Sequence, residues 1–407
     1  MTIIGTTGPL LAFLKVLYDA CGKMNLPFLP VYSWVGLWSS LLLFVSSFFS
    51  TSNVVDYFTR FTDDIFSSLI SVIFIAEAVR DISRNFANPA ISGAQAFISS
   101  FVSLITFLTA NVLVNIRSTP FLNRKVRNFV ADFAPVTGIM VGLISAAKCS
   151  KMYDVVLPTL NVPEVLGTTC GRPWLVDIMS VSNNVKFLCI LPALMATILL
   201  FMDQNITVRL VMSKENKLKK GNGIHLDMFV VAAITAIMSV LGMPWMVAAT
   251  VRSLAHVRAL KEYEMVESAE GDSKMEMTGV KEQRVSGFMI HALIAFSLIF
   301  GRGGLRQIPN AVLTGIFLYL GISSIDKTEL YDRSLLFFMD KRDTPKSSSW
   351  IKSAGLAKTK LFTALQLSLL SAMWWIKGTT FGVFFPVLIG LLVSSSCLLI
   401  VSSNSCV

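Results

Sequence analysis

An aspartate lies inside an apolar run that is long enough to cross a membrane. Asp203 stands near the middle of residues 185–212. The positions that share its helical face are Leu199, Leu200, Ile206 and Thr207. None of these side chains can neutralise a carboxylate, and a charged group at the bilayer centre costs roughly 2.5–3.5 kcal/mol on insertion scales. We therefore expect Asp203 to mark an ion or substrate path; a structural ion pair between helices is the alternative.

Two apolar segments carry helix-breaking residues at their starts. In Thr6-Thr7-Gly8-Pro9, Thr7 can cap a helix, Gly8 permits an unusual backbone and Pro9 suits a first helical turn. Gly242-Met243-Pro244-Trp245 repeats the pattern before residues 247–257. Two interrupted segments in separate halves of a chain predict inverted repeats whose half-helices begin near the membrane midplane. Their exposed amides and positive ends would form an anion site.

The composition excludes a water-soluble globule. Of 407 residues, 54% are hydrophobic and 15% are charged, which leaves too little polar surface to cover a soluble protein of this size. We predict an all-α polytopic membrane protein with about twelve apolar segments in a single domain, residues 1–407. These segments are 3–20, 33–51, 62–80, 96–116, 131–147, 185–212, 225–242, 244–258, 285–300, 306–325, 358–377 and 379–401.

The net charge of +10 does not indicate nucleic acid as a partner. Lys and Arg gather in connections that alternate across the membrane, and the positive-inside rule explains this distribution. One cluster is Arg117, Arg124, Lys125 and Arg127, and it falls on the same, cytoplasmic, side as the polar connections 258–283 and 326–357. We expect these two long connections to be mobile loops, because they are rich in charge and turn residues.

Catalytic and cofactor chemistry lack a signal in the sequence. The six Cys and three His show no metal-ligand spacing, so neither a transition-metal site nor a cofactor is expected. No second carboxylate, nucleophile with a base, or His cluster accompanies Asp203 at a convincing spacing. The chain is therefore not expected to be an enzyme.

Longer stretches of the sequence resemble a known family. They are Thr6-Thr7-Gly8-Pro9-Leu10, Phe201-Met202-Asp203-Gln204-Asn205-Ile206-Thr207, Met243-Pro244-Trp245-Met246-Val247-Ala248-Ala249-Thr250-Val251-Arg252-Ser253 and Val280-Lys281-Glu282-Gln283-Arg284-Val285-Ser286-Gly287. With them the chain resembles the bicarbonate transporters of solute carrier family 4, which include anion exchangers and sodium bicarbonate cotransporters. The resemblance covers almost the whole chain and is weakest in 82–184 and after 390.

The resemblance implies an inverted-repeat fold of seven plus seven segments. In that family a core domain carries substrate and a gate domain mediates dimerisation. On this chain the core would be 1–51 and 185–300, and the gate 52–184 and 301–407. Met1 falls where the family's third segment begins, so we expect the first two segments and the N-terminal cytoplasmic domain to be missing. A multi-pass plasma-membrane protein and a homodimer formed through the gate domain are further expectations.

The resemblance also places ligands at the two half-helices. It implies an anion site for bicarbonate or carbonate at Thr7, Gly8, Pro9, Leu10, Val247, Ala248, Ala249, Thr250, Val251 and Arg252. Sodium would bind at Asp203, Thr207 and Thr7, because one helical turn puts the Thr207 hydroxyl beside the carboxylate and hydroxyl oxygens are hard ligands. The alternative for Thr207 is a hydrogen bond back to the carbonyl of Asp203.

Arg252 favours a different coupling. Anion exchangers of the family have arginine at this position, and a fixed guanidinium strengthens anion binding but repels sodium. Sodium-coupled members have aspartate at the position of Asp203, whereas exchangers have glutamate. We therefore predict alternating-access bicarbonate transport coupled to sodium, with chloride/bicarbonate exchange as the alternative. A borate carrier and a shortened, non-transporting membrane partner are further alternatives, and an Arg252–Asp203 structural bridge would leave the coupling undecided.

Overall fold

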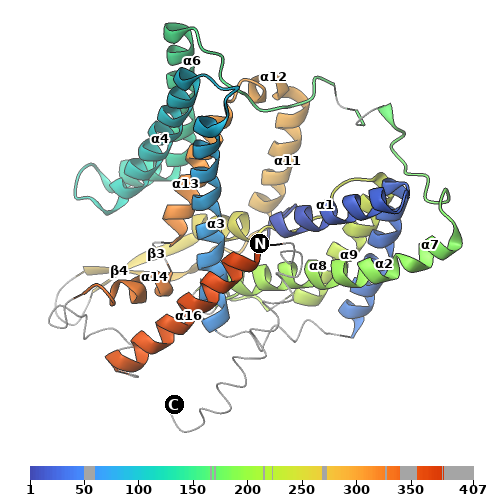
Figure 1. The fold of residues 1–407 in the computed structure, drawn as a ribbon. Coiled ribbons are helices and arrows are strands. Elements are labelled where there is room, and N and C mark those ends of the chain that lie inside the picture. The colour runs from blue at the N-terminus through green and yellow to red at the C-terminus, as the bar shows by residue number, and fades with distance from the viewer. Residues whose placement is uncertain are drawn as a thin grey trace. The chain divides into compact units, whose positions relative to one another are not determined.

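The chain is mostly helical (Figure 1). The computed structural model describes residues 1–49, 60–165, 167–168, 171–213, 216–221, 223–267, 273–325, 328–339, 355–377 and 379. Every apolar segment expected from the sequence coincides with a helix or a broken helix, except 379–401, nearly all of which lies outside the described residues. The local apolar pattern is therefore a reliable guide to the helices of this chain.

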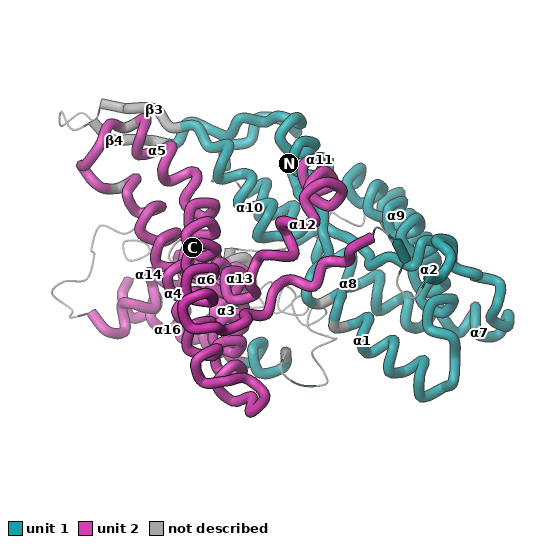
Figure 2. Tube along the Cα trace, turned by 90° about the horizontal axis from the view of Figure 1, so that it is seen from above, with its two compact units in different colours: residues 1–63, 167–292, 372–407 teal, residues 64–166, 293–371 magenta. Residues whose placement is uncertain are grey.

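Unit 1 is the first of two compact units (Figure 2). It comprises Met1–Asp63, Gly167–Ala292 and Ala372–Val407. Its elements are β1 (Ile4–Gly5), α1 (Gly8–Lys23), α2 (Phe28–Phe48), α7 (Asn183–Leu188), α8 (Ile190–Val211), α9 (Ile224–Leu241), β2 (Val247–Ala248), α10 (Thr250–Ala259), β3 (Lys261–Glu267) and β4 (Ser273–Val280), followed by the first half of α11 (Val285–Phe300).

Unit 2 comprises Asp64–Leu166 and Leu293–Ser371. Its elements are most of α3 (Arg60–Ala87), α4 (Gly93–Asn115), the short 3-10 helix η2 (Ile116–Ser118), α5 (Arg124–Asp132), α6 (Ala134–Tyr153), α12 (Arg302–Leu305), α13 (Asn310–Ile325), α14 (Glu329–Leu335) and most of α16 (Leu356–Lys377). The assignment of a core domain and a gate domain to the predicted ranges stays a prediction.

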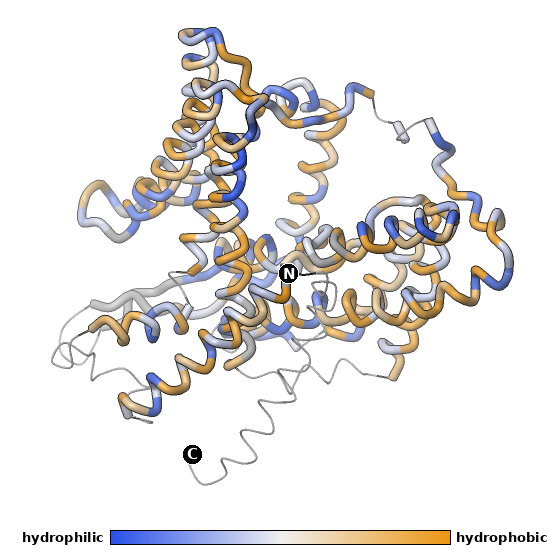
Figure 3. The backbone as a smooth tube through the Cα atoms, in the orientation of Figure 1, coloured by the Kyte–Doolittle hydropathy of each residue, from blue (hydrophilic) through white to orange (hydrophobic). Residues whose placement is uncertain are grey.

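Several helices have the length and composition of membrane spans. Within the described residues these are α2, α4, α9 and the run Asn183–Val211, which joins α7 to α8. Figure 3 shows hydrophobic residues along most of their length. The α5–α6 pair would be a further span, bent by 58°, and α11 and α13 are shorter apolar helices. Short and broken segments are typical of transporters that hold substrate near the midplane.

In unit 1, helix α2 packs against both α8 and α9. The contact with α9 is close because Gly36 has no side chain: a Cβ there would lie 1.8 Å from the Ser239 hydroxyl. Ser239 in turn accepts a hydrogen bond of 2.8 Å from Trp245 Nε1, and the buried Trp245 ring stacks on Tyr32 of α2 at 4.7 Å. The side chain of Trp245 thereby anchors the segment that follows α9.

The break after α9 is formed by Gly242 and stabilised by hydrogen bonds from Arg172. Gly242 has φ of +62°, a left-handed conformation that ends the helix at little cost for glycine. The Arg172 guanidinium donates hydrogen bonds of 3.1 and 3.2 Å to the carbonyl oxygens of Leu241 and Gly242. The Tyr32 hydroxyl donates to the carbonyl of Met243. The carbonyl groups that the helix end leaves unpaired thus find donors.

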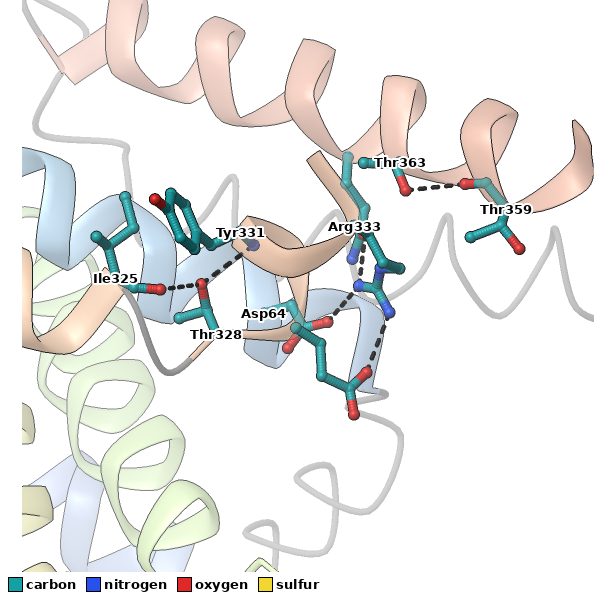
Figure 4. A network of polar contacts seen from close by, with 9 residues as sticks. Asp64, Ile325, Thr328, Tyr331, Arg333, Thr359 and Thr363 are labelled. Atoms are coloured by element: carbon teal, nitrogen blue, oxygen red, sulfur yellow. Dashed lines mark hydrogen bonds and ion pairs between the residues drawn. The ribbon is translucent and has the colours of Figure 1, made fainter. Parts of the chain in front are cut away.

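In unit 2, a polar network around Arg333 links α3, α14 and α16 (Figure 4). The guanidinium is 6% exposed and lies 2.7 Å from the Asp64 carboxylate and 3.0 Å from the Glu329 carboxylate. It also donates a 3.0 Å hydrogen bond to Gln366 and lies over the Phe362 ring at 5.4 Å. A buried positive charge is therefore neutralised among these helices by carboxylates that are partly exposed.

The connection between α10 and α11 differs from the expected mobile loop. Helix α10 continues to Ala259, and β3 pairs antiparallel with β4 from Lys261↔Val280 to Glu267↔Ser273. Residues 268–272 lie outside the described residues. The all-α prediction therefore holds for the main elements, while two short antiparallel strand pairs, β1–β2 and β3–β4, add to it.

Candidate functional site

Two short strands bring the interrupted segments together in unit 1. Ile4 pairs with Ala248 and Gly5 with Val247 in an antiparallel ladder. The Ala249 amide extends the ladder with a 2.8 Å hydrogen bond to the Ile3 carbonyl. Helices α1 and α10 begin a few residues after these strands. Because the strands run antiparallel, the two helices leave the strand pair in opposite senses with their N-termini toward it.

A buried serine ties the two strands from the side of α10. The Ile3 amide donates a 2.9 Å hydrogen bond to the Ser253 hydroxyl, which returns a weaker one of 3.4 Å to the Ile3 carbonyl. Ser253 belongs to the first turns of α10 and is fully buried. The N-terminal strand is thus fixed to the second half-helix by side-chain and backbone bonds together.

The first amides of each half-helix have no acceptor among the described residues. In α1 the first intrahelical bond runs from Leu11 to the Thr7 carbonyl, which leaves the amides of Gly8 and Leu10 available. Pro9 carries no amide hydrogen. In α10 the first bond runs from Ser253 to the Ala249 carbonyl, so the amides of Thr250, Val251 and Arg252 are available. Helix N-termini with unpaired amides attract anions.

In other residues of the predicted anion set, the backbone amides form hydrogen bonds within the protein. The Ala248 amide donates a 2.8 Å hydrogen bond to the Gln204 side chain, and the Ala249 amide is taken up by Ile3. Val247 lies in the ladder opposite Gly5. These amides therefore hold the strand pair in place and do not face a ligand.

Asp203 lies beside the start of α1. Its side chain is 6% exposed, and Oδ2 accepts a 2.6 Å hydrogen bond from the Thr7 hydroxyl. Thr7 occupies the N-cap position of α1, but its hydroxyl makes no capping bond to the helix. The prediction that the Thr7 side chain caps α1 is therefore wrong. Its hydroxyl donates instead to the buried carboxylate of Asp203 on α8, which needs a hydrogen-bond donor.

Within the described residues, the Thr207 hydroxyl contacts β2 and α10 and not the carboxylate one turn earlier. Its hydroxyl donates to the Ala248 carbonyl at 3.1 Å and lies 2.7 Å from the Thr250 hydroxyl. The alternative of a bond back to the Asp203 carbonyl is not what the structure has. Thr207 and Thr250 instead form a pair of hydroxyls between α8 and the first residue of α10.

Arg252 does not form an ion pair with Asp203 within the described part of the chain. Its side chain is exposed, and the guanidinium packs against the backbone of Gly5: a Cβ on Gly5 would lie 3.1 Å from Nη1. The structural bridge considered for these two residues is therefore absent here. The hydrogen bond from Thr7 is the side-chain contact that Asp203 makes among the described residues.

Two neighbours of Asp203 on α8, Gln204 and Asn205, add buried polar side chains to the site. Gln204 holds the Ala248 amide, and Asn205 is 1% exposed with neither side-chain oxygen nor nitrogen hydrogen-bonded among the described residues. A polar triplet inside an apolar run is visible in the sequence, but the direction of each side chain is not.

Two broken helices that begin at a shared strand pair, beside a membrane-embedded carboxylate, define the class of inverted-repeat secondary transporters. The chain belongs to the bicarbonate transporter family: residues 1–96 and 89–402 match the HCO3- transporter integral membrane domain. The family consists of membrane transporters and not of enzymes. The predicted family and the predicted fold class are both confirmed.

The relatives include a sodium bicarbonate exchanger and an anion transport protein. The chain is 32% identical to the electroneutral sodium bicarbonate exchanger 1 of Mus musculus over 461 residues, which covers 96% of this chain and 41% of that protein. It is 31% identical to the band 3 anion transport protein of Rattus norvegicus over 408 residues, covering 95% and 43%. The chain thus spans less than half the length of these relatives.

Two solved structures share the fold at low sequence identity. The transmembrane domain of the cyanobacterium bicarbonate transporter BicA matches with a TM-score of 0.50 and 13% identity, covering 91% of this chain and 82% of that chain. The structure of SLC26A9 matches with a TM-score of 0.52 and 13% identity, covering 99% and 57%. These likenesses support the architecture alone.

Proposed function

We propose that this chain transports bicarbonate or carbonate by alternating access, coupled to sodium. The observation that carries the proposal is the β1–β2 pairing, which gathers the free amides of α1 and α10 close to the Thr7–Asp203 hydrogen bond. A planar oxyanion fits amides from two helix ends, because each end contributes donors and a positive dipole. The anion would contact the amides of Gly8, Leu10, Thr250 and Val251.

Sodium would bind on the carboxylate side of the same site. Asp203 supplies the charge, and the hydroxyl oxygens of Thr7, Thr207 and Thr250 are hard donors close to it or to the start of α10. A cation there would offset the cost of a buried carboxylate and the repulsion between that carboxylate and the transported anion. Coupling follows, because each ion makes the site more favourable for the other.

Chloride/bicarbonate exchange is the second candidate, and Arg252 favours it. The exposed guanidinium lies on the first turn of α10 and adds a fixed positive charge beside amides that already attract anions. A monovalent anion could then be held without sodium. The proposal also includes a homodimer formed through the gate ranges and a place in the plasma membrane, as the family resemblance implies.

The test follows pH recovery in cells that express the full chain. Acid-loaded cells in bicarbonate would recover in sodium, and recovery would stop when sodium is removed. Dependence on chloride in place of sodium selects exchange, and no bicarbonate-dependent recovery contradicts both functions. Asp203→Asn should abolish sodium-dependent recovery, whereas Asp19→Asn, an exposed carboxylate on α1, is the matched control and should leave it unchanged.

A further inference from the structure

A short amphipathic helix in unit 2 carries an exposed apolar stripe. Helix α5 turns away from α6 by 58°. Phe121 and Leu122 precede the helix, and Val126, Phe129 and Phe133 follow one side of it; the five side chains are 73%, 60%, 48%, 64% and 49% exposed. The Phe129 and Phe133 rings contact each other at 4.7 Å. We refer to residues 121–133 as the interfacial segment.

The stripe continues onto α6. Val136, Met140 and Ile144 follow Phe133 at helical spacing and are all about half exposed. Exposed apolar side chains on a membrane-spanning helix contact lipid tails. The exposed apolar side chains of α5 therefore continue the exposed apolar stripe of α6. If α6 crosses a membrane, the bend of 58° would turn α5 toward the membrane surface.

A free cation accompanies the apolar stripe. Lys125 is exposed, stands one turn before Phe129, and its ammonium group has no partner within the described residues. Two nearby arginines are already engaged: Arg117 lies 2.5 Å from the Asp132 carboxylate, and Arg127 donates a 2.6 Å hydrogen bond to the Thr119 carbonyl. Among Arg117, Lys125 and Arg127, it is therefore Lys125 that is available to an external anion.

The segment is held in shape before any partner arrives. Asn123 caps α5 by accepting a hydrogen bond from the Lys125 amide, and Arg127 ties the helix to the turn after η2. Helix α5 also packs against η2 and the end of α4. Binding would then cost little ordering of the chain, because the apolar stripe and Lys125 are already presented together.

We propose that the interfacial segment lies in the cytoplasmic membrane interface and binds anionic phospholipid. Val126, Phe129 and Phe133 enter the boundary between headgroups and acyl chains, and Lys125 contacts the headgroup phosphate or carboxylate. The bilayer is the occupant that fits, because the apolar stripe is continuous with the lipid-facing side of α6 and the cation adjoins it. Nothing in this proposal depends on which ion is transported.

Native mass spectrometry of the purified full chain tests whether the positive charge of Lys125 contributes to lipid binding. We expect phosphatidylserine to bind more tightly than phosphatidylcholine, and Lys125→Gln to weaken phosphatidylserine binding about fivefold, the effect of one basic residue near an anionic surface. Lys148→Gln, an exposed lysine at the other end of α6, is the matched control and should not change it. Equal binding by Lys125→Gln and the unchanged chain would overturn the proposal.

Hydrogen exchange of the full chain in nanodiscs tests the location without a substitution. Amides of residues 124–132 should exchange more slowly in nanodiscs that contain phosphatidylserine than in phosphatidylcholine alone, whereas amides of 148–153 should not differ. Identical exchange in both nanodiscs would contradict lipid binding. Protection that appears only when an acidic protein segment is added would replace the bilayer with a protein as the occupant.

Discussion

The Thr7 hydroxyl donates a 2.6 Å hydrogen bond to the Asp203 carboxylate. The two residues are far apart in sequence, and one lies at the N-cap of α1 while the other lies inside α8. Thr7 belongs to both the predicted anion site and the predicted sodium site, so this hydrogen bond places the two sites next to each other. It also supplies a second oxygen beside the carboxylate, so any cation bound to Asp203 can contact the threonine as well.

Thr7→Val should weaken sodium coupling. The substitution keeps the shape of the side chain but removes the hydroxyl, and a hydrogen bond to a charged group contributes about 1.5–3 kcal/mol. We expect the apparent sodium affinity of bicarbonate-dependent pH recovery to fall roughly tenfold or more. Thr7→Ser is the matched control, because it retains the hydroxyl and should retain most of the affinity. Equal sodium affinity in all three proteins would contradict a role for Thr7.

Gly5→Ala should alter the contribution of Arg252. The added Cβ would meet Nη1 of Arg252 at 3.1 Å and Cβ of Ala249 at 3.7 Å, so the flexible guanidinium must move by a few tenths of an ångström while the backbone can stay. If Arg252 holds the transported anion, the bicarbonate concentration for half-maximal transport should rise. Transport assays over a range of bicarbonate concentrations measure this.

The control for this substitution is Gly22→Ala, also in unit 1. A Cβ at Gly22 meets no atom within 4 Å, so transport should not change. If Gly5→Ala behaves like Gly22→Ala, the position of the guanidinium is unimportant for anion binding. The exchange alternative would then lose its main support.

Substitution by leucine should have different effects on thermal stability at Gln204 and at Asn205. Gln204→Leu leaves the buried Ala248 amide without its acceptor, which costs about 1–3 kcal/mol, so the midpoint of thermal unfolding in detergent should fall. Asn205 has no hydrogen-bonding partner among the described residues, and Asn205→Leu removes two unpaired polar atoms from a buried position. Its unfolding midpoint should stay equal or rise.

A transport assay of Asn205→Leu shows whether the Asn205 amide contacts a ligand during the transport cycle or has no role in the ion path. A stabilised Asn205→Leu protein that still transports means that the amide has no function in the ion path. A stabilised protein that has lost transport means that the amide serves a ligand during the cycle. A destabilised Asn205→Leu protein would contradict the prediction, because the amide must then have a partner in the folded chain.

Local chemistry explains which parts of the fold the sequence could predict. Gly8-Pro9 and Gly242-Met243-Pro244 constrain their own backbone, so the breaks before α1 and α10 follow from residue type. Spans of bilayer length follow from apolar content, since the hydrocarbon thickness fixes the number of residues. The β3–β4 hairpin was missed because its acidic residues suggest a solvated loop and mask the strand pattern.

The site required information that no local pattern contains. Whether an amide is free depends on tertiary partners, such as Gln204 for Ala248 and Ile3 for Ala249. The hydroxyl of Thr7 had two possible acceptors, the helix end and Asp203, and burial of the carboxylate favours the second. Helical spacing predicts the Thr207 hydroxyl beside Asp203, yet its partners are Ala248 of β2 and Thr250 of α10. Sequence reasoning thus identifies the helices that contribute to the site better than it identifies the atoms.

Arg333→Met should destabilise the protein strongly. The guanidinium is buried and donates to the partly exposed carboxylates of Asp64 and Glu329, so its removal takes away hydrogen bonds to charged groups and should cost about 1.5–3 kcal/mol. The unfolding midpoint in detergent should fall by several degrees. Arg84→Met is the control: its ion pair with Asp81 is exposed and 3.9 Å long, and such pairs contribute about 0–1 kcal/mol. If both variants unfold at the same temperature, the Arg333 network does not stabilise the packing of α3, α14 and α16.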